Sequence, residues 1–120
     1  KASKEAGMAV LMGAPNIVRG SSHSGNVSAR DLASAGHLDI LSSDYIPFSL
    51  IQAVYTLPQL VDGYTLPQAI NLVTRNPAKA VGFADRGTLA SGKRADMVRV
   101  HMQNAIPVVR SVWREGQRVL

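Results

Sequence analysis

The sequence predicts a mixed α/β fold with a parallel sheet, and three observations support this fold class. Two short apolar runs, residues 8–12 and 40–43, each end in a turn-rich or polar stretch, which is typical of buried parallel strands. A helical segment at residues 28–35 lies between them and completes a βαβ unit. From residue 85 onward, turns and alternating apolar residues predict further strands.

The amino-acid composition limits which classes of protein this chain can belong to. The 120 residues are 46% hydrophobic and 18% charged, which suits one modest globular core. No apolar run approaches the ~18 residues of a membrane span, so no membrane partner is expected. The absence of cysteine excludes disulfides and thiolate metal sites, and it is compatible with the predicted cytoplasmic location.

The net charge of +5 raises the question of whether the chain binds nucleic acid. The 13 Lys and Arg residues are scattered and aromatic residues make up 5%, so no nucleic-acid partner is expected. A phosphate-bearing substrate would explain the basic balance equally well.

The chain opens as the end of a helix closed by Gly7, so we expect it to be a piece of a longer protein. The first strand follows, and residues 13–16 have the composition of a turn.

A long polar loop then covers residues 19–26. Unpaired amides at a helix start, permissive glycines and a guanidinium can together cradle an oxyanion, and the alternative is a solvated surface loop. Residues 28–31 form a capping box that opens a helix through Ala35, which Gly36 closes. The substrate-binding candidates in the loop are Arg19, His23, Ser24 and Asn26.

Asp44 is the central candidate for chemistry because it follows the second strand directly. Ligands bind at the carboxyl ends of strands in parallel α/β proteins. The alternative is that Asp44 only caps the next helix, since Pro47 follows it within one turn.

Three helices and a set of strands are expected downstream. One helix runs from Pro47 to about residue 57 and ends before Pro58, with an apolar stripe that includes Phe48. A capping box at residues 65–68 opens the next, and Asn76–Pro77 restarts a short third helix that Gly82 closes.

Strands are expected at residues 95–100 and 108–112, and a tight turn at 114–117 leads into the final residues. The arginines of this region are assigned to solvated strand faces. Lys93 and Arg94 are assigned to the surface, and His101 to a structural role at a strand end. Trp113 is assigned to the core or to hairpin packing.

Residues 76–82 (NPAKAVG) and 86–98 (RGTLASGKRADMV) resemble the closing segment of amidohydrolase-superfamily enzymes. The resemblance implies that residues 1–84 are the C-terminal part of a metal-dependent (β/α)8 barrel, holding its last two strands and the helices that follow. It implies that residues 85–120 are strands of a composite β-sandwich.

The upstream half, at residues 12–16, 19–26 and 40–45, is similar to the diphosphatases of phosphonate catabolism in the carbon–phosphorus lyase pathway. Ser21 stands where a second glycine is expected beside Gly20. The resemblance implies hydrolysis of a ribose phosphonate 5-triphosphate to the 5-phosphate and diphosphate. It assigns Asp44 to a divalent metal ion, zinc or similar, and to proton abstraction from the bound water, with the other ligands outside this chain.

A closed barrel takes ~250 residues, so we expect these 120 residues to be inactive alone. Uncovered strand edges favour a homo-oligomer. Two alternatives stay open, namely another amidohydrolase that opens cyclic amides, and a non-catalytic scaffold that keeps the fold without a metal site.

Overall fold

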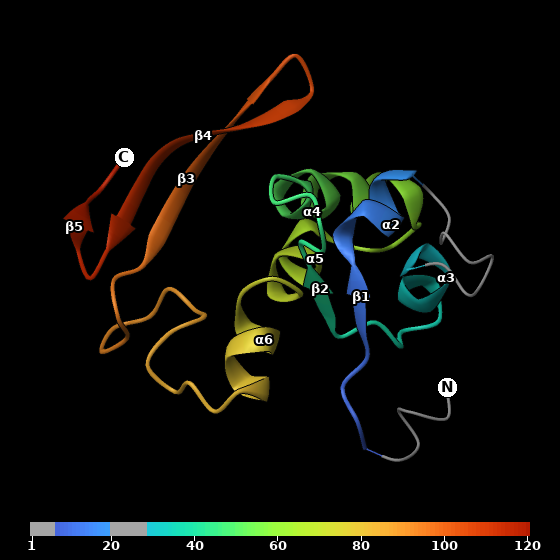
Figure 1. The fold of residues 1–120 in the computed structure, drawn as a ribbon, viewed down its shortest axis with the longest axis horizontal. Helices are drawn as coiled ribbons and strands as arrows, with labels where there is room; N and C mark the ends of the chain where they lie inside the picture. The colour runs from blue at the N-terminus through green and yellow to red at the C-terminus, as the bar shows by residue number, and fades with distance from the viewer. Residues whose placement is uncertain (1–6, 20–28) are drawn as a thin grey trace.

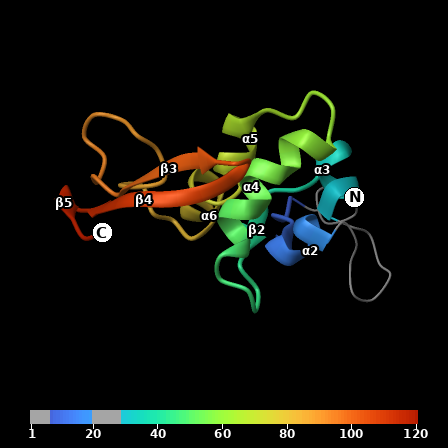
Figure 2. The same ribbon diagram turned by 90° about the horizontal axis from the view of Figure 1, so that it is seen from above.

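A computed structural model describes residues 7–19 and 29–120 of the chain. It contains an α/β part, with two short parallel strands among five helices, and a separate antiparallel sheet of three strands (Figure 1). Seen from above, the sheet lies at one end of the molecule and the N-terminal helices at the other (Figure 2). The mixed α/β class predicted from the sequence is therefore confirmed. The predicted site residues His23, Ser24 and Asn26 lie outside the described residues.

The two strands of the α/β part are β1 (Leu11–Gly13) and β2 (Ile40–Ser42), which pair in parallel. The predicted βαβ unit is confirmed, because α3 (Ala29–Ser34) lies between the strands in the chain. The strand predicted at residues 8–12 is present only in part, and its predicted burial is wrong. β1 starts later, and Met8 and Leu11 are 56% and 55% exposed, since β1 pairs only with β2 in the described part of the chain.

A helix, α2 (Ala14–Arg19), replaces the turn expected at residues 13–16. Pro15 suits this place because the second residue of a helix needs no backbone N–H donor. Ala14 and Ile17 are buried, so apolar packing supports the helix where the local composition had indicated a turn.

Two helix termini follow the predicted chemistry closely. Gly36 ends α3 at a φ of 73°, and the His37 N–H donates to the Leu32 carbonyl at 2.8 Å, as in a Schellman motif. The predicted capping box opens α5 (Leu66–Asn71), where the Gln68 N–H donates to Thr65 Oγ1 and the Thr65 N–H donates to Gln68 Oε1. Helix α6 (Arg75–Ala80) follows, and Gly82 adopts a φ of 80° after it.

The longest helix, α4 (Ser49–Leu60), differs from the prediction at both ends. It begins after Pro47 and continues past Pro58. The missing N–H of Pro58 removes one bond within the last turn only, and the Val61 N–H closes the helix on the Leu57 carbonyl at 3.1 Å. Phe48, expected in the apolar stripe, is 74% exposed because it lies before the helix.

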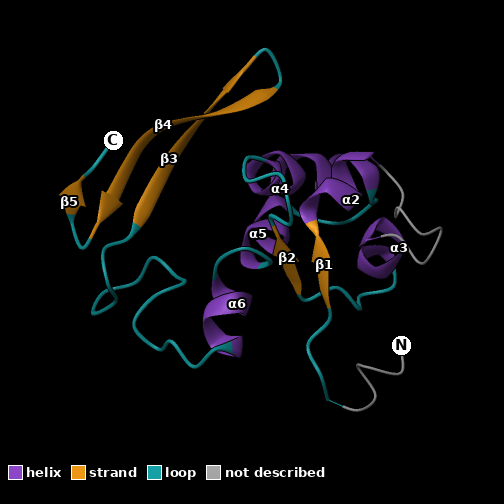
Figure 3. Ribbon diagram, in the orientation of Figure 1, coloured by secondary structure: helices purple, strands orange, loops and turns teal. Residues whose placement is uncertain are grey.

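The hydrophobic core belongs to the α/β part. Helices surround the two strands there (Figure 3), and the Leu41 N–H donates to the Leu72 carbonyl, which joins β2 to the end of α5. No helix in the described ranges is long and apolar enough to cross a bilayer. The main core residues are Ala14, Ile17, Ala33, Leu38, Leu41, Ala53, Val54, Leu57, Val61, Ala69 and Leu72.

The antiparallel sheet contains β3 (Met97–Gln103), β4 (Ile106–Arg114) and β5 (Gln117–Arg118). Both hairpins have two-residue turns with positive φ, at Asn104–Ala105 and at Glu115–Gly116, as type I′ turns require. The second turn was predicted and the first was not. Both main strands are longer than expected, so His101 lies within β3 and not at its end.

Candidate functional site

Asp44 lies two residues after β2, with its side chain exposed. Its φ of 52° is a left-handed backbone conformation, which Asp and Asn adopt more readily than most residues. The helix-capping alternative is wrong for α4, because its N-cap is Phe48 and no side chain caps it. Asp44 is therefore presented at a strand end without a local structural task in the following helix.

The Asp44 carboxylate rests against the end of the neighbouring strand. Gly13 is the last residue of β1, and a Cβ atom added there would lie 3.1 Å from Asp44 Oδ2 and 3.3 Å from Asp44 Cβ. These are tight contacts, so the bare glycine backbone is what allows the carboxylate to lie this close. The structure thus brings Asp44 to the carboxyl ends of both parallel strands, where sequence reasoning had expected a site.

A buried hydroxyl fixes the segment that carries Asp44. Ser49 is 2% exposed, and its Oγ lies 2.6 Å from the Ile46 carbonyl oxygen and 3.2 Å from that of Ser43. The Ile46 N–H also donates to the Ser43 carbonyl at 3.1 Å. The first turn of α4 therefore holds residues 43–46 as a tight turn.

The other predicted site residues come from the segment after β1. Arg19 is the last residue of α2, which starts directly at the end of β1, and only its backbone position is described. The substrate-binding role of Arg19, and those of His23, Ser24 and Asn26, stay predictions. Asn16, on the same helix, has a buried Oδ1 without a hydrogen-bond partner among the described residues, which makes it an additional polar candidate near this rim.

The described residues do not form a complete metal centre. No group of three or more His, Cys, Asp or Glu side chains that could hold an ion occurs in residues 7–19 and 29–120. Asp44 offers one exposed carboxylate, the oxygen donor type that divalent ions bind. The chain as described fits a contributor of one ligand and does not fit a resident ion on its own.

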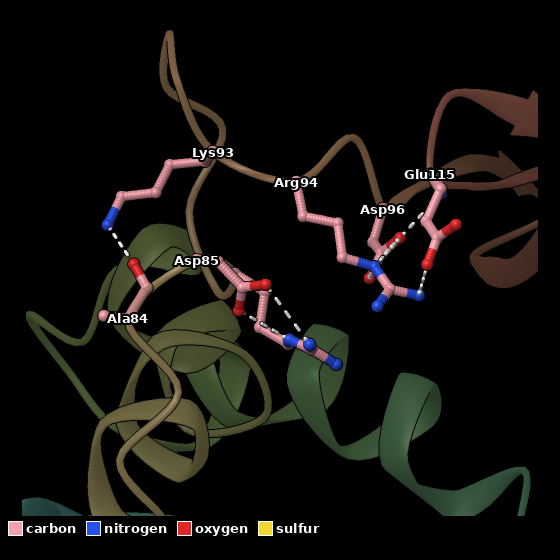
Figure 4. A network of polar contacts seen from close by, with 7 residues as sticks. Ala84, Asp85, Lys93, Arg94, Asp96 and Glu115 are labelled. Atoms are coloured by element: carbon pink, nitrogen blue, oxygen red, sulfur yellow. Dashed lines mark hydrogen bonds and ion pairs between the residues drawn. The ribbon is translucent and has the colours of Figure 1, made fainter.

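A second polar cluster joins the loop before β3 to the β4–β5 turn (Figure 4). Arg94 Nε lies 2.8 Å from Asp96 Oδ2, and Arg94 Nη2 lies 3.2 Å from Glu115 Oε1. The Glu115 N–H donates to Asp96 Oδ1 at 2.9 Å. This backbone hydrogen bond and the Arg94 guanidinium together lower the pKa of the Asp96 carboxyl.

This cluster corrects the expectation that Arg94 lies on a solvated strand face. Its side chain is only 20% exposed, and its backbone N–H donates to the Asp85 carbonyl. Local spacing could not identify this role because Glu115 lies 21 positions later in the chain. The cluster fixes a loop against a hairpin, and its hydrogen bonds and ion pairs join Arg94, Asp96 and Glu115 to one another and not to Gly13 or Asp44.

Sequence reasoning missed the supporting roles of Gly13 and Ser49. Gly13 had been assigned to a turn, although a glycine that directly ends an apolar strand also signals close approach of another group. Ser49 carried a weaker signal, as a small hydroxyl residue between Phe48 and Leu50 at the start of a helix.

Comparison with known proteins supports the family expectation. Residues 5–120 match the model of the amidohydrolase family. The chain is 54% identical, over 99% of its length, to the alpha-D-ribose 1-methylphosphonate 5-triphosphate diphosphatase of Escherichia coli (strain K12), and it spans 32% of that relative. It is also 37% identical, over 75% of its length, to an imidazolonepropionase from Deinococcus deserti, covering 26% of that protein.

The fold has a solved counterpart. The crystal structure of an amidohydrolase from Thermotoga maritima matches with a TM-score of 0.65 at 19% identity, over 98% of this chain and 38% of the other. The chain spans about a third of the length of the relatives it matches. With the family model matching nearly the whole chain, these residues belong to the amidohydrolase family.

Proposed function

We propose that the chain contributes part of the active site of a hydrolase that cleaves α-D-ribose 1-methylphosphonate 5-triphosphate to the 5-phosphate and diphosphate. The observation that carries the proposal is the 54% identity to the E. coli diphosphatase. That similarity extends over both the strand ends and the 19–26 loop, and it is higher than the 37% shared with the imidazolonepropionase.

Asp44 is the residue to which we assign the chemistry. It is exposed at the carboxyl ends of β1 and β2 and rests on the Gly13 backbone, where a carboxylate can accept a proton from an attacking water. A divalent ion would lower the pKa of that water. Such an ion needs further ligands beyond the described residues.

Arg19, His23, Ser24 and Asn26 complete the proposal as substrate-binding residues. A guanidinium can bind two phosphate oxygens at once, and hydroxyl, amide and imidazole groups can donate to the others. Neutralising the charge that develops on the departing diphosphate is the main catalytic task in phosphoryl transfer.

The experiment follows the substrate by phosphorus NMR. The longest natural form of the protein is incubated with the ribose phosphonate triphosphate and a divalent ion, and we expect diphosphate and the 5-phosphate to appear together. An unchanged spectrum from folded, metal-loaded protein would remove the proposal.

Asp44→Asn tests the assigned residue within the same assay. Asn has nearly the same shape and tolerates positive φ, so the fold is retained while the base is lost, and we expect the rate to fall by about 10²–10⁴-fold or more. Asp62→Asn is the matched control, because Asp62 is also an exposed aspartate but lies after α4. Equal rates for the two variants would contradict the role of Asp44.

Opening of a cyclic amide is the second candidate, favoured by the similarity to imidazolonepropionase. The same preparation should then hydrolyse imidazolone propionate and leave the sugar triphosphate intact. Activity on the triphosphate alone would exclude this candidate.

We also propose that these residues form homo-oligomers. We propose further that they are inactive without the rest of the protein, and that the protein is located in the cytoplasm. Leu11 in β1 and Phe48 before α4 are 55% and 74% exposed, and exposed apolar side chains favour association. Light scattering after size exclusion measures the mass, and a monomer at all concentrations would contradict association.

A further inference from the structure

A cavity of about 200 Å³ lies between α6 and the loop that follows it. We define the cation pocket as Arg75, Lys79, Arg86 and Lys93 together with Phe83 and Thr88, all of which line this cavity. We propose that the cation pocket binds a small polyphosphate anion of the size of diphosphate, at a place separate from Asp44. This inference uses only residues 75–93 and does not depend on the proposed hydrolase function.

The cation pocket lies at the opposite end of β2 from Asp44. Asn76, in α6, donates from Nδ2 to the carbonyl of Asp39 at 2.8 Å, and Asp39 immediately precedes β2. Asp44 follows the other end of the same strand. Figure 1 shows α6 on that far side, away from the helices that follow the carboxyl ends of the strands.

Two of the cations are held in place by the loop. Arg86 Nε donates to Asp85 Oδ1 at 2.9 Å, and its guanidinium lies 4.6 Å from the centre of the Phe83 ring. Lys93 Nζ donates to the Ala84 carbonyl (Figure 4). Each group still has unused N–H donors, because a guanidinium has five and an ammonium has three.

The other two cations come from α6 and have unfavourable positions in the absence of an anion. Arg75 and Lys79 are four residues apart, so two like charges share one helix face. Arg75 also opens the helix, where the helix dipole disfavours positive charge. Neither side chain has an ion pair within the described residues, and a bound anion would relieve both repulsions.

Charge and size indicate the class of ligand. Four cations line the cavity, and the Asp85 carboxylate pairs with Arg86. Asp96 and Glu115 also act on Arg86, but both are paired with Arg94. The cations of the pocket therefore outnumber the carboxylates paired with them, which suits an anion with several phosphate charges. The cavity is smaller than the ~300–1,000 Å³ typical of sites for drug-sized ligands. Binding of a nucleic-acid strand usually uses several aromatic faces for base stacking, whereas the lining residues include one aromatic, Phe83, and Arg86 already covers one face of its ring.

The test titrates inorganic diphosphate into the protein by calorimetry, without divalent ions and at low salt. We expect saturable binding that weakens as salt is added, and a melting temperature raised by about 3 °C or more at saturation. Arg75→Gln/Lys79→Gln should weaken diphosphate binding at least about tenfold, since it removes the two pocket cations that have no ion pair in the described part of the chain. Circular dichroism confirms that each variant is folded.

The matched control is Arg99→Gln/Arg114→Gln, which removes two exposed charges on β3 and β4, outside the cavity. Its affinity for diphosphate should stay within about twofold of the unmodified protein. Equal losses in both double variants, undiminished binding in Arg75→Gln/Lys79→Gln, or sulfate binding as tightly as diphosphate would each overturn the proposal. In particular, undiminished binding in Arg75→Gln/Lys79→Gln would show that diphosphate binds elsewhere, for example near the ends of β1 and β2 where Asp44 lies.

Discussion

The backbone of Gly13 is the surface on which the Asp44 carboxylate rests, and Gly13→Ala tests whether this contact matters. The added Cβ would lie 3.1 Å from Asp44 Oδ2, so the exposed carboxylate must move by a few tenths of an ångström. Gly13 is absent from the residues with positive φ, hence alanine suits its backbone. We expect stability to change by less than about 1 kcal/mol. In the longest natural form of the protein, the rate of the proposed hydrolysis should fall about tenfold or more.

The readouts are urea unfolding and the phosphorus NMR assay, with the added metal kept constant. Stability lost together with activity would show that Gly13 is only a packing position. Full activity would show that the carboxylate does not need its present position. Asp44→Asn serves as the reference for complete loss of the base.

At the scale of one helix, the capping box of α5 gives a direct stability test. Thr65→Ala removes the oxygen that accepts from the Gln68 N–H at 3.3 Å, and we expect a loss of about 1 kcal/mol. Thr65→Ser keeps the oxygen and should retain most of that free energy of unfolding. Equal stabilities of the two variants in urea would mean that the cap contributes nothing measurable.

The stabilisation from the contacts between the loop before β3 and the β4–β5 turn should depend on pH. The Glu115 N–H and Arg94 lower the pKa of Asp96 on folding, so the unfolded chain binds this proton more tightly. The stabilisation is therefore present above the unfolded value of about 3.9 and is lost as the pH falls through the lower folded value. We expect the melting temperature of the unmodified protein to exceed that of Asp96→Asn at pH 7.

Below about pH 4 this difference should narrow, because protonation makes Asp96 resemble the neutral asparagine. Asn keeps an oxygen that can accept from Glu115, so the comparison isolates the charge. A constant difference between pH 7 and pH 3 would assign the effect to shape and not to ionisation.

The same elements show how far sequence reasoning extends. The Thr65 capping box, the Gly36 helix end and the parallel pairing of β1 with β2 were predictable because their signals are local or periodic. Helix α2 and the continuation of α4 past Pro58 were not, since Ile17 and Leu57 are held by packing against distant residues. Within the site, the position of Asp44 followed from strand order, whereas its contact with Gly13 depends on two segments 31 positions apart.

For the whole molecule, the decisive contrast is between its two parts. The residues of the hydrophobic core lie between positions 14 and 72, all within the α/β part. In the antiparallel sheet Ser111 is buried at 1% exposure, while Val98 and Ile106 are 53% and 63% exposed. Burial of apolar surface is the main favourable term in folding, so the α/β part should account for most of the stability.

Hydrogen exchange of the chain tests this division residue by residue. We expect amides of α4 near Ala53 and Leu57, both fully buried, to exchange only on global unfolding. Amides of β3 and β4 should exchange through a smaller opening that leaves α4 intact, at rates faster by about tenfold or more. Uniform protection across both parts would contradict the prediction, because it would require the sheet to unfold together with a core in which it places few apolar side chains.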